Sequence, residues 1–256
     1  MSPEHDFTVR NGSHSGARRS ALRRVLIVSN NPLSTTENNG KTILSYFDDW
    51  ADVDVMQIYF RPESPGAVCG TSATTGQGMT FFQLTDRQVL GHRSGRIFSL
   101  SEQDIQEQLT TVKIKHKPNE VNRLYRANIR NKASIKLLRE VHWKCYNFVK
   151  HNQQLLAKVK EFDPDILFFC AGDALFSFDI VEILLDHISA SLVLYITDDY
   201  ILPYEGVSPL VSWRRSLIRK KMLAAADRAE LVFTIGEKMQ RTYKDLYGIE
   251  SERLVN

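Results

Sequence analysis

Short, continuous apolar runs recur along this chain and alternate with segments whose apolar residues follow helical spacing. A strand that is buried on both faces carries such an unbroken run, and strands of this kind belong to parallel sheets covered by helices. A helix between successive strands makes each repeat a βαβ unit. We therefore predict an α/β fold with a Rossmann-like parallel sheet flanked by helices. The predicted strands are 25–29, 53–60, 79–86, 165–170, 191–197 and 230–236.

Composition and patterning divide the chain into a tail and one main domain. The 256 residues are 43% hydrophobic and 25% charged, which suits one large globular domain or two small ones. Residues 1–22 are polar and basic, so we predict a mobile tail before a domain at 23–256. Residues 87–162 contain no run typical of a strand and are predicted to form a mostly helical insertion. Segment 62–78, rich in Gly, Ser, Thr and Pro, is predicted to be a flexible loop.

Charge, cysteine content and hydropathy exclude several classes of protein. A net charge of +3 does not favour nucleic acid as a partner. No apolar run reaches the roughly 18 residues that a membrane-spanning helix needs. The three widely separated cysteines fit a reducing compartment. We therefore expect a cytoplasmic protein, either in solution or peripheral at the inner face of a membrane.

Two basic segments bear on the question of membrane contact. One lies between Thr111 and Arg139 and the other is SWRRSLIRKKMLAAA at 212–226. In the second segment we expect Trp213 to face the core and Arg214 to face solvent. Each segment is either a solvated helix face or a surface for an anionic partner such as a lipid phosphate or an acidic glycan.

The loop STTENNGKT at 34–42, after the first strand, has three interpretations. Its GKT ending matches the tail of the P-loop pattern, but the first Gly of that pattern is missing and a glutamate inside the loop would repel phosphate. Alternatively, the loop opens the first helix of a Rossmann-like domain, where Gly40 lets the backbone approach a ligand beside the helix N-terminus. The third interpretation is a turn with an Asn cap and no ligand. The candidate binding residues are Asn39, Gly40 and Lys41.

Acidic residues follow three of the later strands. In open α/β sheets, ligands bind outside the carboxyl ends of the strands. Asp173, Asp198 and Asp199 are candidate catalytic residues, because a carboxylate there can hold a substrate hydroxyl or take its proton. Tyr200 and Glu237 are candidate substrate-binding residues. Each acid also stands where it can cap a helix or a turn, so a purely structural role is the alternative.

The C-terminal stretch has the most specific pattern. An Ala-Asp pair at 226–227 precedes the strand LVFTI, and a Gly-Glu pair at 236–237 opens the next helix. That helix ends in Tyr-Gly at 247–248, and the chain continues to RLVN at 253–256. In this order, the motifs resemble the end of the N-terminal domain of GT-B glycosyltransferases of the family 4 type.

Three earlier segments resemble motifs of the same family. They are the loop TENNGKT at 36–42, the strand DPDILFFCAGD at 163–173 and the strand end YITDDY at 195–200. The resemblance extends from Arg24 to Asn256, with the exception of 87–162.

The resemblance implies that this chain is the acceptor-binding half of a glycosyltransferase. Such an enzyme transfers a sugar from a nucleotide-sugar donor to a hydroxyl of a glycan, a lipid or a small molecule, as in polysaccharide biosynthesis, without a cofactor or a metal. The family holds the donor mainly in a C-terminal domain, which is absent from this chain. The family's catalytic histidine would fall near Cys170, so Asp173 or the pair Asp198 and Asp199 would take its place. Two alternatives remain open, a non-catalytic module that binds a glycan, lipid or protein, and a P-loop-type nucleotide hydrolase.

Overall fold

The computed structural model describes residues 23–254 except for 37, 48–49, 51, 113–132, 203–205 and 207. The predicted tail at 1–22 and most of the first basic segment lie outside the described residues. Within the described part of the chain, no helix combines the length and the hydropathy that crossing a bilayer requires.

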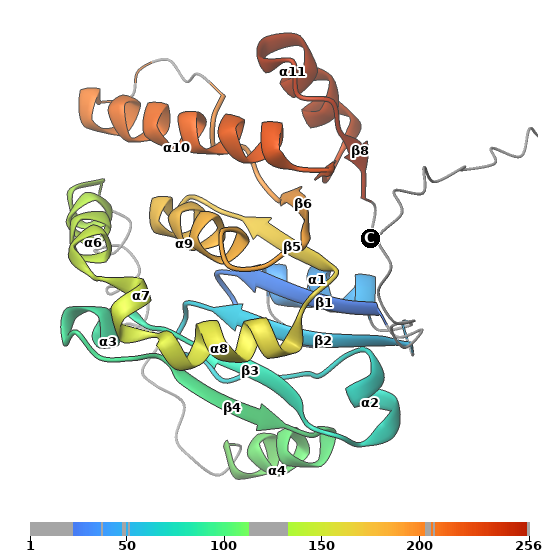
Figure 1. The fold of residues 1–256 in the computed structure, drawn as a ribbon. Coiled ribbons are helices and arrows are strands. Elements are labelled where there is room, and N and C mark those ends of the chain that lie inside the picture. Colours follow the sequence, from blue (N-terminus) through green and yellow to red (C-terminus); the bar gives the residue numbers. More distant parts are fainter. Residues whose placement is uncertain are drawn as a thin grey trace, which may run out of the picture.

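A single eight-stranded sheet runs through the molecule in the order β4-β3-β2-β1-β5-β6-β7-β8 (Figure 1). Neighbouring strands pair in parallel, except that β4 is antiparallel to β3. All six predicted strands are present, and the predicted α/β fold with a Rossmann-like sheet is confirmed. The strands are β1 (Arg23–Ser29), β2 (Val53–Tyr59), β3 (Met79–Gln83), β4 (Arg96–Leu100), β5 (Ile166–Ala171), β6 (Ser191–Ile196), β7 (Leu231–Thr234) and β8 (Glu252–Arg253).

Burial on both faces explains the unbroken apolar runs. Successive residues of a strand point to opposite faces of the sheet. In β1, Leu26 and Val28 pack into one apolar core, whereas Val25 and Ile27 pack into the core on the other face. A strand of this kind has no solvent-facing side on which polar residues would alternate.

Helices cover both faces of the sheet, and Figure 1 shows α8 and α9 in front of it with α1 behind. The core that contains Val25 is completed by α1 (Asn38–Phe47), α2 (Thr71–Thr75) and α4 (Glu102–Val112). The core that contains Leu26 is completed by the remaining helices. These are α3 (Asp86–Leu90), α6 (Ala133–Cys145), α7 (Phe148–His151), α8 (Gln153–Phe162), α9 (Leu175–Leu185), α10 (Pro209–Arg228) and α11 (Glu237–Tyr247).

The prediction that 87–162 contains no strand is wrong at β4. This strand lies at the edge of the sheet and alternates, with Phe98 stacked on Phe81 at a centroid separation of 5.8 Å while Ile97 and Ser99 are exposed. An edge strand covered on one face needs no continuous apolar run, so it lacks the signal on which the prediction relied. The other described elements of this segment are helices, as predicted.

Segment 62–78 is more ordered than its composition suggests. Ala67, Val68 and Cys69 are buried, and the short helix α2 follows them. Gly70 lies between them with a positive φ of 66°, and a Cβ at this position would overlap the carbonyl oxygen of Val53. The glycine therefore allows the backbone of this segment to pack closely against β2, and it does not indicate a flexible loop.

Candidate functional site

The winding of the sheet changes direction beside β1, because β2 lies on one side of it and β5 on the other. Open α/β sheets bind ligands at such a switch point, outside the carboxyl ends of the strands. Asn30 follows β1 here, and its amide nitrogen occupies the space that a Cβ on Gly172 would need. Among the described residues, the Oδ1 atom of Asn30 is buried and accepts no hydrogen bond. The switch point thus contains a buried amide oxygen that has no hydrogen-bond partner among the described residues.

The loop between β1 and α1 is held by a buried glutamine of β2. The side-chain oxygen of Gln57 accepts a hydrogen bond from the backbone N–H of Leu33 at 3.1 Å. Its amide nitrogen donates to the Ser29 hydroxyl at 2.9 Å and to the Asn31 carbonyl at 3.1 Å. Because Gln57 is completely buried, these bonds give the loop one fixed path.

Gly40 lies in the first turn of α1 and is buried. A Cβ at this position would overlap the carbonyl oxygen of Pro32 and lie 3.2 Å from the backbone nitrogen of Ser34. The close approach that this glycine permits is therefore between α1 and its own preceding loop. Lys41, the next residue, is exposed.

Asn39 connects the α1 end of this loop to the carboxyl end of β6. Its amide nitrogen donates to the Thr197 hydroxyl at 3.2 Å, and that hydroxyl lies 3.2 Å from the Tyr200 hydroxyl. Thr197 also lies 3.4 Å from the carbonyl oxygen of Ala171, at the end of β5. We call Asn39, Thr197 and Tyr200 the polar wall. Burial raises the pKa of Tyr200 to about 12, so its hydroxyl keeps its proton at neutral pH.

The two acids that follow β6 have different surroundings. Asp198 is exposed, and its Oδ1 accepts a hydrogen bond from the backbone N–H of Asp199 at 2.8 Å. Asp199 accepts one from the backbone N–H of Leu202 at 3.0 Å and lies 3.7 Å from the guanidinium of Arg215. Asp199 therefore holds the turn, which is the structural alternative considered for this pair, whereas Asp198 is accessible from solvent.

Glu237 lies apart from these residues. It is the first residue of α11, is exposed, and pairs with Arg241 one helical turn later. This is the stabilising position of a carboxylate at a helix N-terminus.

A cavity of about 460 Å³ opens beside Asp173, within the size range of small-molecule sites. We call it the charged cavity. It lies next to the ends of β2, β3 and β5, and is walled by α6 and α10. Its lining residues are Phe60, Arg61, Pro62, Thr85, Asp86, Arg87, Ile135, Lys136, Arg139, Glu140, Asp173 and Arg214.

Asp173 is the one predicted site residue that lines the charged cavity. Its Oδ2 lies 2.7 Å from Nζ of Lys136 and 3.4 Å from Nη1 of Arg214. Burial alone would raise the pKa of Asp173, but the hydrogen bond and charge of Lys136, with Arg214 and Arg139, outweigh it and lower that pKa. A carboxylate held in this way is a weak proton acceptor, so the geometry favours positioning over base catalysis.

Glu140 of α6 caps the neighbouring helix α9. Its two carboxylate oxygens accept hydrogen bonds from the backbone N–H groups of Leu175 at 3.0 Å and Phe176 at 3.2 Å. Nη2 of Arg214 lies 3.3 Å from the same carboxylate and also donates to the carbonyl oxygen of Asp173. Burial raises the pKa of Glu140, although the Leu175 N–H and the charge of Arg214 oppose this shift. The carboxylate thereby joins α6, α9 and α10 at the cavity.

Arg139 is oriented by an acid and two aromatic rings. Its Nε lies 2.7 Å from Oδ1 of Asp86, which also accepts a hydrogen bond from the Trp143 indole at 2.7 Å. The guanidinium carbon lies 4.7 Å from the ring centroid of Phe176. The rings of Trp143 and Phe176 stack with centroids 3.6 Å apart. The cation is therefore held in place before any ligand binds.

Sequence reasoning missed most of the charged cavity. Arg214 was expected on the solvent face of its helix with Trp213 in the core, and the structure reverses both positions. Arg214 is 8% exposed and Trp213 is 50% exposed. A hydrophobic pattern places an arginine on the surface of a helix. Here two acids from distant segments pair with the guanidinium and offset the free-energy cost of burying it. Lys136 and Arg139 lay in the segment interpreted as a solvated face or an anion-binding surface, and nothing local singled out Glu140.

The described residues contain no group of three or more His, Cys, Asp or Glu side chains arranged to hold a metal ion. Amide, hydroxyl and ion-paired groups make up the site instead, and they suit hydrogen bonding to hydroxyls and pairing with anions. No protein-family model and no curated protein matches this chain significantly.

Proposed function

We propose that this chain is the acceptor-binding half of a glycosyltransferase that takes its sugar from a nucleotide-sugar donor. One observation carries the proposal. The three segments that resemble family motifs, 36–42, 163–173 and 195–200, meet at one edge of the sheet through Asn39, Thr197 and the carbonyl oxygen of Ala171. Segments so distant in sequence have no local reason to meet there, and this edge is where α/β sheets bind ligands.

The polar wall supplies groups that match sugar hydroxyls. Tyr200 keeps its proton and is able to donate a hydrogen bond, and the hydroxyl oxygen of Thr197 is able to accept one. Asp198 is an exposed carboxylate that directly follows Thr197 of the polar wall, and it takes the role of base toward the acceptor hydroxyl. Asp173 orients Lys136 and Arg214 beside it. The donor is held by a second domain, as the family resemblance implies.

The test is sugar transfer by this chain expressed together with the sequence that follows it in its reading frame. A panel of nucleotide-sugars is offered with mixed glycan and lipid acceptors, and labelled product is measured. Asp198→Asn should lower the rate by about 100-fold or more, because general-base catalysis contributes about 10²–10⁴-fold. Glu230→Gln, an exposed acid before β7, is the matched control and should leave the rate unchanged. Full activity of an Asp173→Asn, Asp198→Asn double variant would refute the roles given to these residues.

One observation favours a second candidate, a non-catalytic module that binds a glycan, a lipid or a protein. The two most buried acids of the charged cavity, Asp173 and Glu140, already pair with cations or accept hydrogen bonds from backbone N–H groups, so neither is free to act as a base. Specific binding of an acceptor glycan without transfer from any donor would select this candidate.

The P-loop hydrolase receives no comparable support. A Cβ on Gly40 would overlap the carbonyl oxygen of Pro32, so packing against the preceding loop accounts for the glycine without a phosphate. Calorimetry with Mg–ATP should show no binding that depends on Lys41.

A further inference from the structure

The charged cavity carries an excess of positive charge. Five of its lining side chains are cations, namely Arg61, Arg87, Lys136, Arg139 and Arg214. Three are carboxylates, namely Asp86, Glu140 and Asp173. The described lining therefore has two more positive charges than negative ones. A concave site with an excess of one sign raises the local concentration of counter-ions and favours a ligand of opposite charge.

The inner cations are fixed in place without a ligand. Lys136 and Arg214 are held by Asp173, and Arg139 by Asp86 and the face of Phe176. The Nε atom of Arg214 is buried, and it has no hydrogen-bond partner among the described residues. Side chains that are already ordered lose little conformational entropy when an anion binds, which favours affinity.

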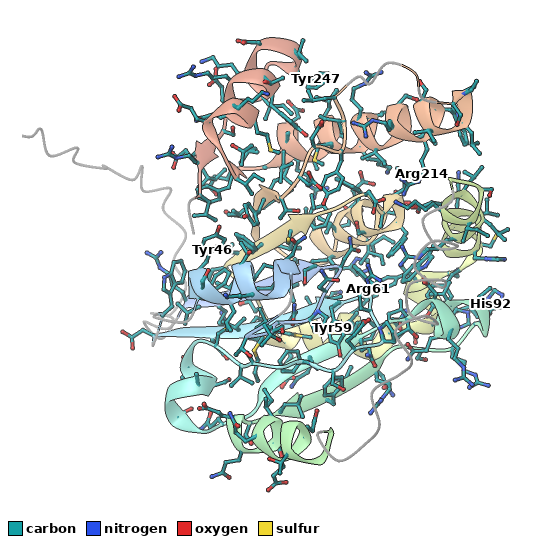
Figure 2. The ribbon with its side chains drawn as sticks, turned by 180° about the vertical axis from the view of Figure 1, so that it is seen from behind. Tyr46, Tyr59, Arg61, His92, Arg214 and Tyr247 are labelled. Carbon is teal, nitrogen blue, oxygen red and sulfur yellow. The ribbon has the colours of Figure 1, made fainter. Side chains whose placement is uncertain are left out.

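Arg87 stands at the exposed side of the same cavity. It belongs to α3, and none of the described residues forms an ion pair or a side-chain hydrogen bond with its guanidinium. Figure 2 shows Arg61 and Arg214 on the same side of the molecule, Arg61 after β2 and Arg214 on α10. The cavity thus has ordered cations from α6 and α10 on its inner side and an accessible arginine at its edge.

We propose that the charged cavity binds a phosphate group, and that the acceptor of the proposed transfer is a phosphate-bearing molecule. That the bound molecule is a sugar acceptor rests on the proposed function. That the cavity binds a phosphate rests only on the residues that line it. A phosphate monoester carries about 1.5 to 2 negative charges at neutral pH, which balances the excess of two, whereas a carboxylate carries one. Arginine is well suited to phosphate because its guanidinium donates two parallel hydrogen bonds. The phosphate belongs either to a soluble sugar phosphate or to a lipid headgroup.

The first measurement is calorimetric titration of the protein with glycerol 3-phosphate at low salt. We expect saturable binding that weakens as salt is added, because mobile ions screen the charges. Uncharged glycerol should not bind. A titration with glycerol 3-phosphate that shows no saturable binding overturns the proposal.

Substitution of Arg87 tests whether the charge excess is responsible. Arg87→Gln should weaken phosphate binding by about threefold to tenfold, because one charge-assisted hydrogen bond is removed. Arg87→Glu lowers the net charge of the described lining from +2 to zero and should abolish saturable binding. Arg93→Gln and Arg93→Glu are the matched controls, since Arg93 is an exposed arginine six positions later that does not line the cavity. Because Arg87 is exposed, these variants should fold normally, and native-like affinity in Arg87→Glu contradicts the proposal.

Flotation with vesicles distinguishes the two sources of the phosphate. The vesicles contain phosphatidylcholine alone or phosphatidylcholine with phosphatidic acid, which has a monoester headgroup. Binding to the second kind, lost in Arg87→Glu and retained in Arg93→Glu, assigns the phosphate to a lipid. Saturable binding of glycerol 3-phosphate without binding to either kind of vesicle assigns the phosphate to a soluble molecule.

The outcome for the site is separable from the outcome for the proposed function. Phosphate binding that depends on Arg87, without sugar transfer to any acceptor, supports the site and refutes the glycosyltransferase. Sugar transfer to an uncharged acceptor, with no phosphate binding, supports the enzyme and refutes the phosphate site.

Discussion

The charged cavity and the polar wall lie at the same edge of the sheet, but different interactions build them. In the charged cavity, Asp173 and Glu140 are paired with cations that come from α6 and α10. In the polar wall, Asn39, Thr197 and Tyr200 interact through uncharged hydrogen bonds. The comparison shows that an acid at a strand end has no fixed role. Asp173 and Asp199 are both strand-end acids. Asp173 is part of a cavity because the distant Lys136 and Arg214 pair with it, whereas Asp199 braces a turn through the backbone N–H of nearby Leu202.

The largest expected effect is on the charged cavity, at its most buried carboxylate. Glu140→Ala leaves Arg214 and the first N–H groups of α9 without their partner. Breaking a buried pair in this way costs about 3–5 kcal/mol of unfolding free energy. Urea denaturation at neutral pH measures the loss. Glu237→Ala, at an exposed helix start outside both regions, is the control and should change stability little. Equal losses of stability in the two variants would show that Glu140 does not belong to a buried network of charges.

The next effect concerns the loop before α1, the helix that carries Asn39 of the polar wall. Gly40→Ala places a Cβ against the carbonyl oxygen of Pro32, and overpacking of this kind costs about 1–3 kcal/mol. Gly66→Ala is the matched control, because its Cβ would lie 3.6 Å from Ser34, an ordinary contact. Thermal denaturation of both variants compares them. If Gly40→Ala is as stable as Gly66→Ala, α1 does not require the close approach to its loop.

A smaller loss is expected from the polar wall itself. Asn39→Ala removes the hydrogen bond to Thr197, and one such neutral bond contributes about 1 kcal/mol. Lys41→Ala, two residues later and exposed, should leave the unfolding midpoint unchanged. Hydrogen exchange at the backbone of 197–202 should accelerate only in Asn39→Ala, and an unchanged exchange rate would disprove the link between α1 and β6.

The smallest effect is the pH dependence that Asp173 contributes. Its pKa is lower in the folded protein than in the unfolded chain, mainly through Lys136 and against the opposing effect of burial. The carboxylate therefore stabilises the fold above about pH 4, the usual pKa of an aspartate, and this contribution disappears as the pH falls through the folded-state value. Because the side chain is 36% exposed, the contribution is at most about 1 kcal/mol. Asp173→Asn should be less stable than the native chain at pH 7 and equal to it in strong acid.

The sheet was predictable from the sequence because burial on both faces leaves a local signature. The runs in β1, β2 and β5 are visible without any knowledge of their neighbours. The antiparallel edge strand β4 was missed, since it is covered on one face and three of its five residues are exposed, so it has no continuous buried apolar run.

The candidate site was predictable only in part. Strand ends are local, so Asp173, Asp198 and Asp199 were found, together with the loop that contains Asn39. Glu140 and Arg214 were not, because their burial depends on contacts between helices that are 74 residues apart in sequence. No local pattern encodes that contact.

The order of residues alone determined the α/β class, the positions of the central strands and the set of polar residues that follow them, because these depend on periodicity and on turn chemistry within short segments. Only the tertiary structure decided which of those residues meet. The order of the strands brings β1, β5 and β6 together, and the packing of α6 against α9 and α10 turns an apparent surface arginine into a buried one. A buried charge needs partners of opposite charge or hydrogen-bonding groups, and the fold supplies them from distant parts of the chain.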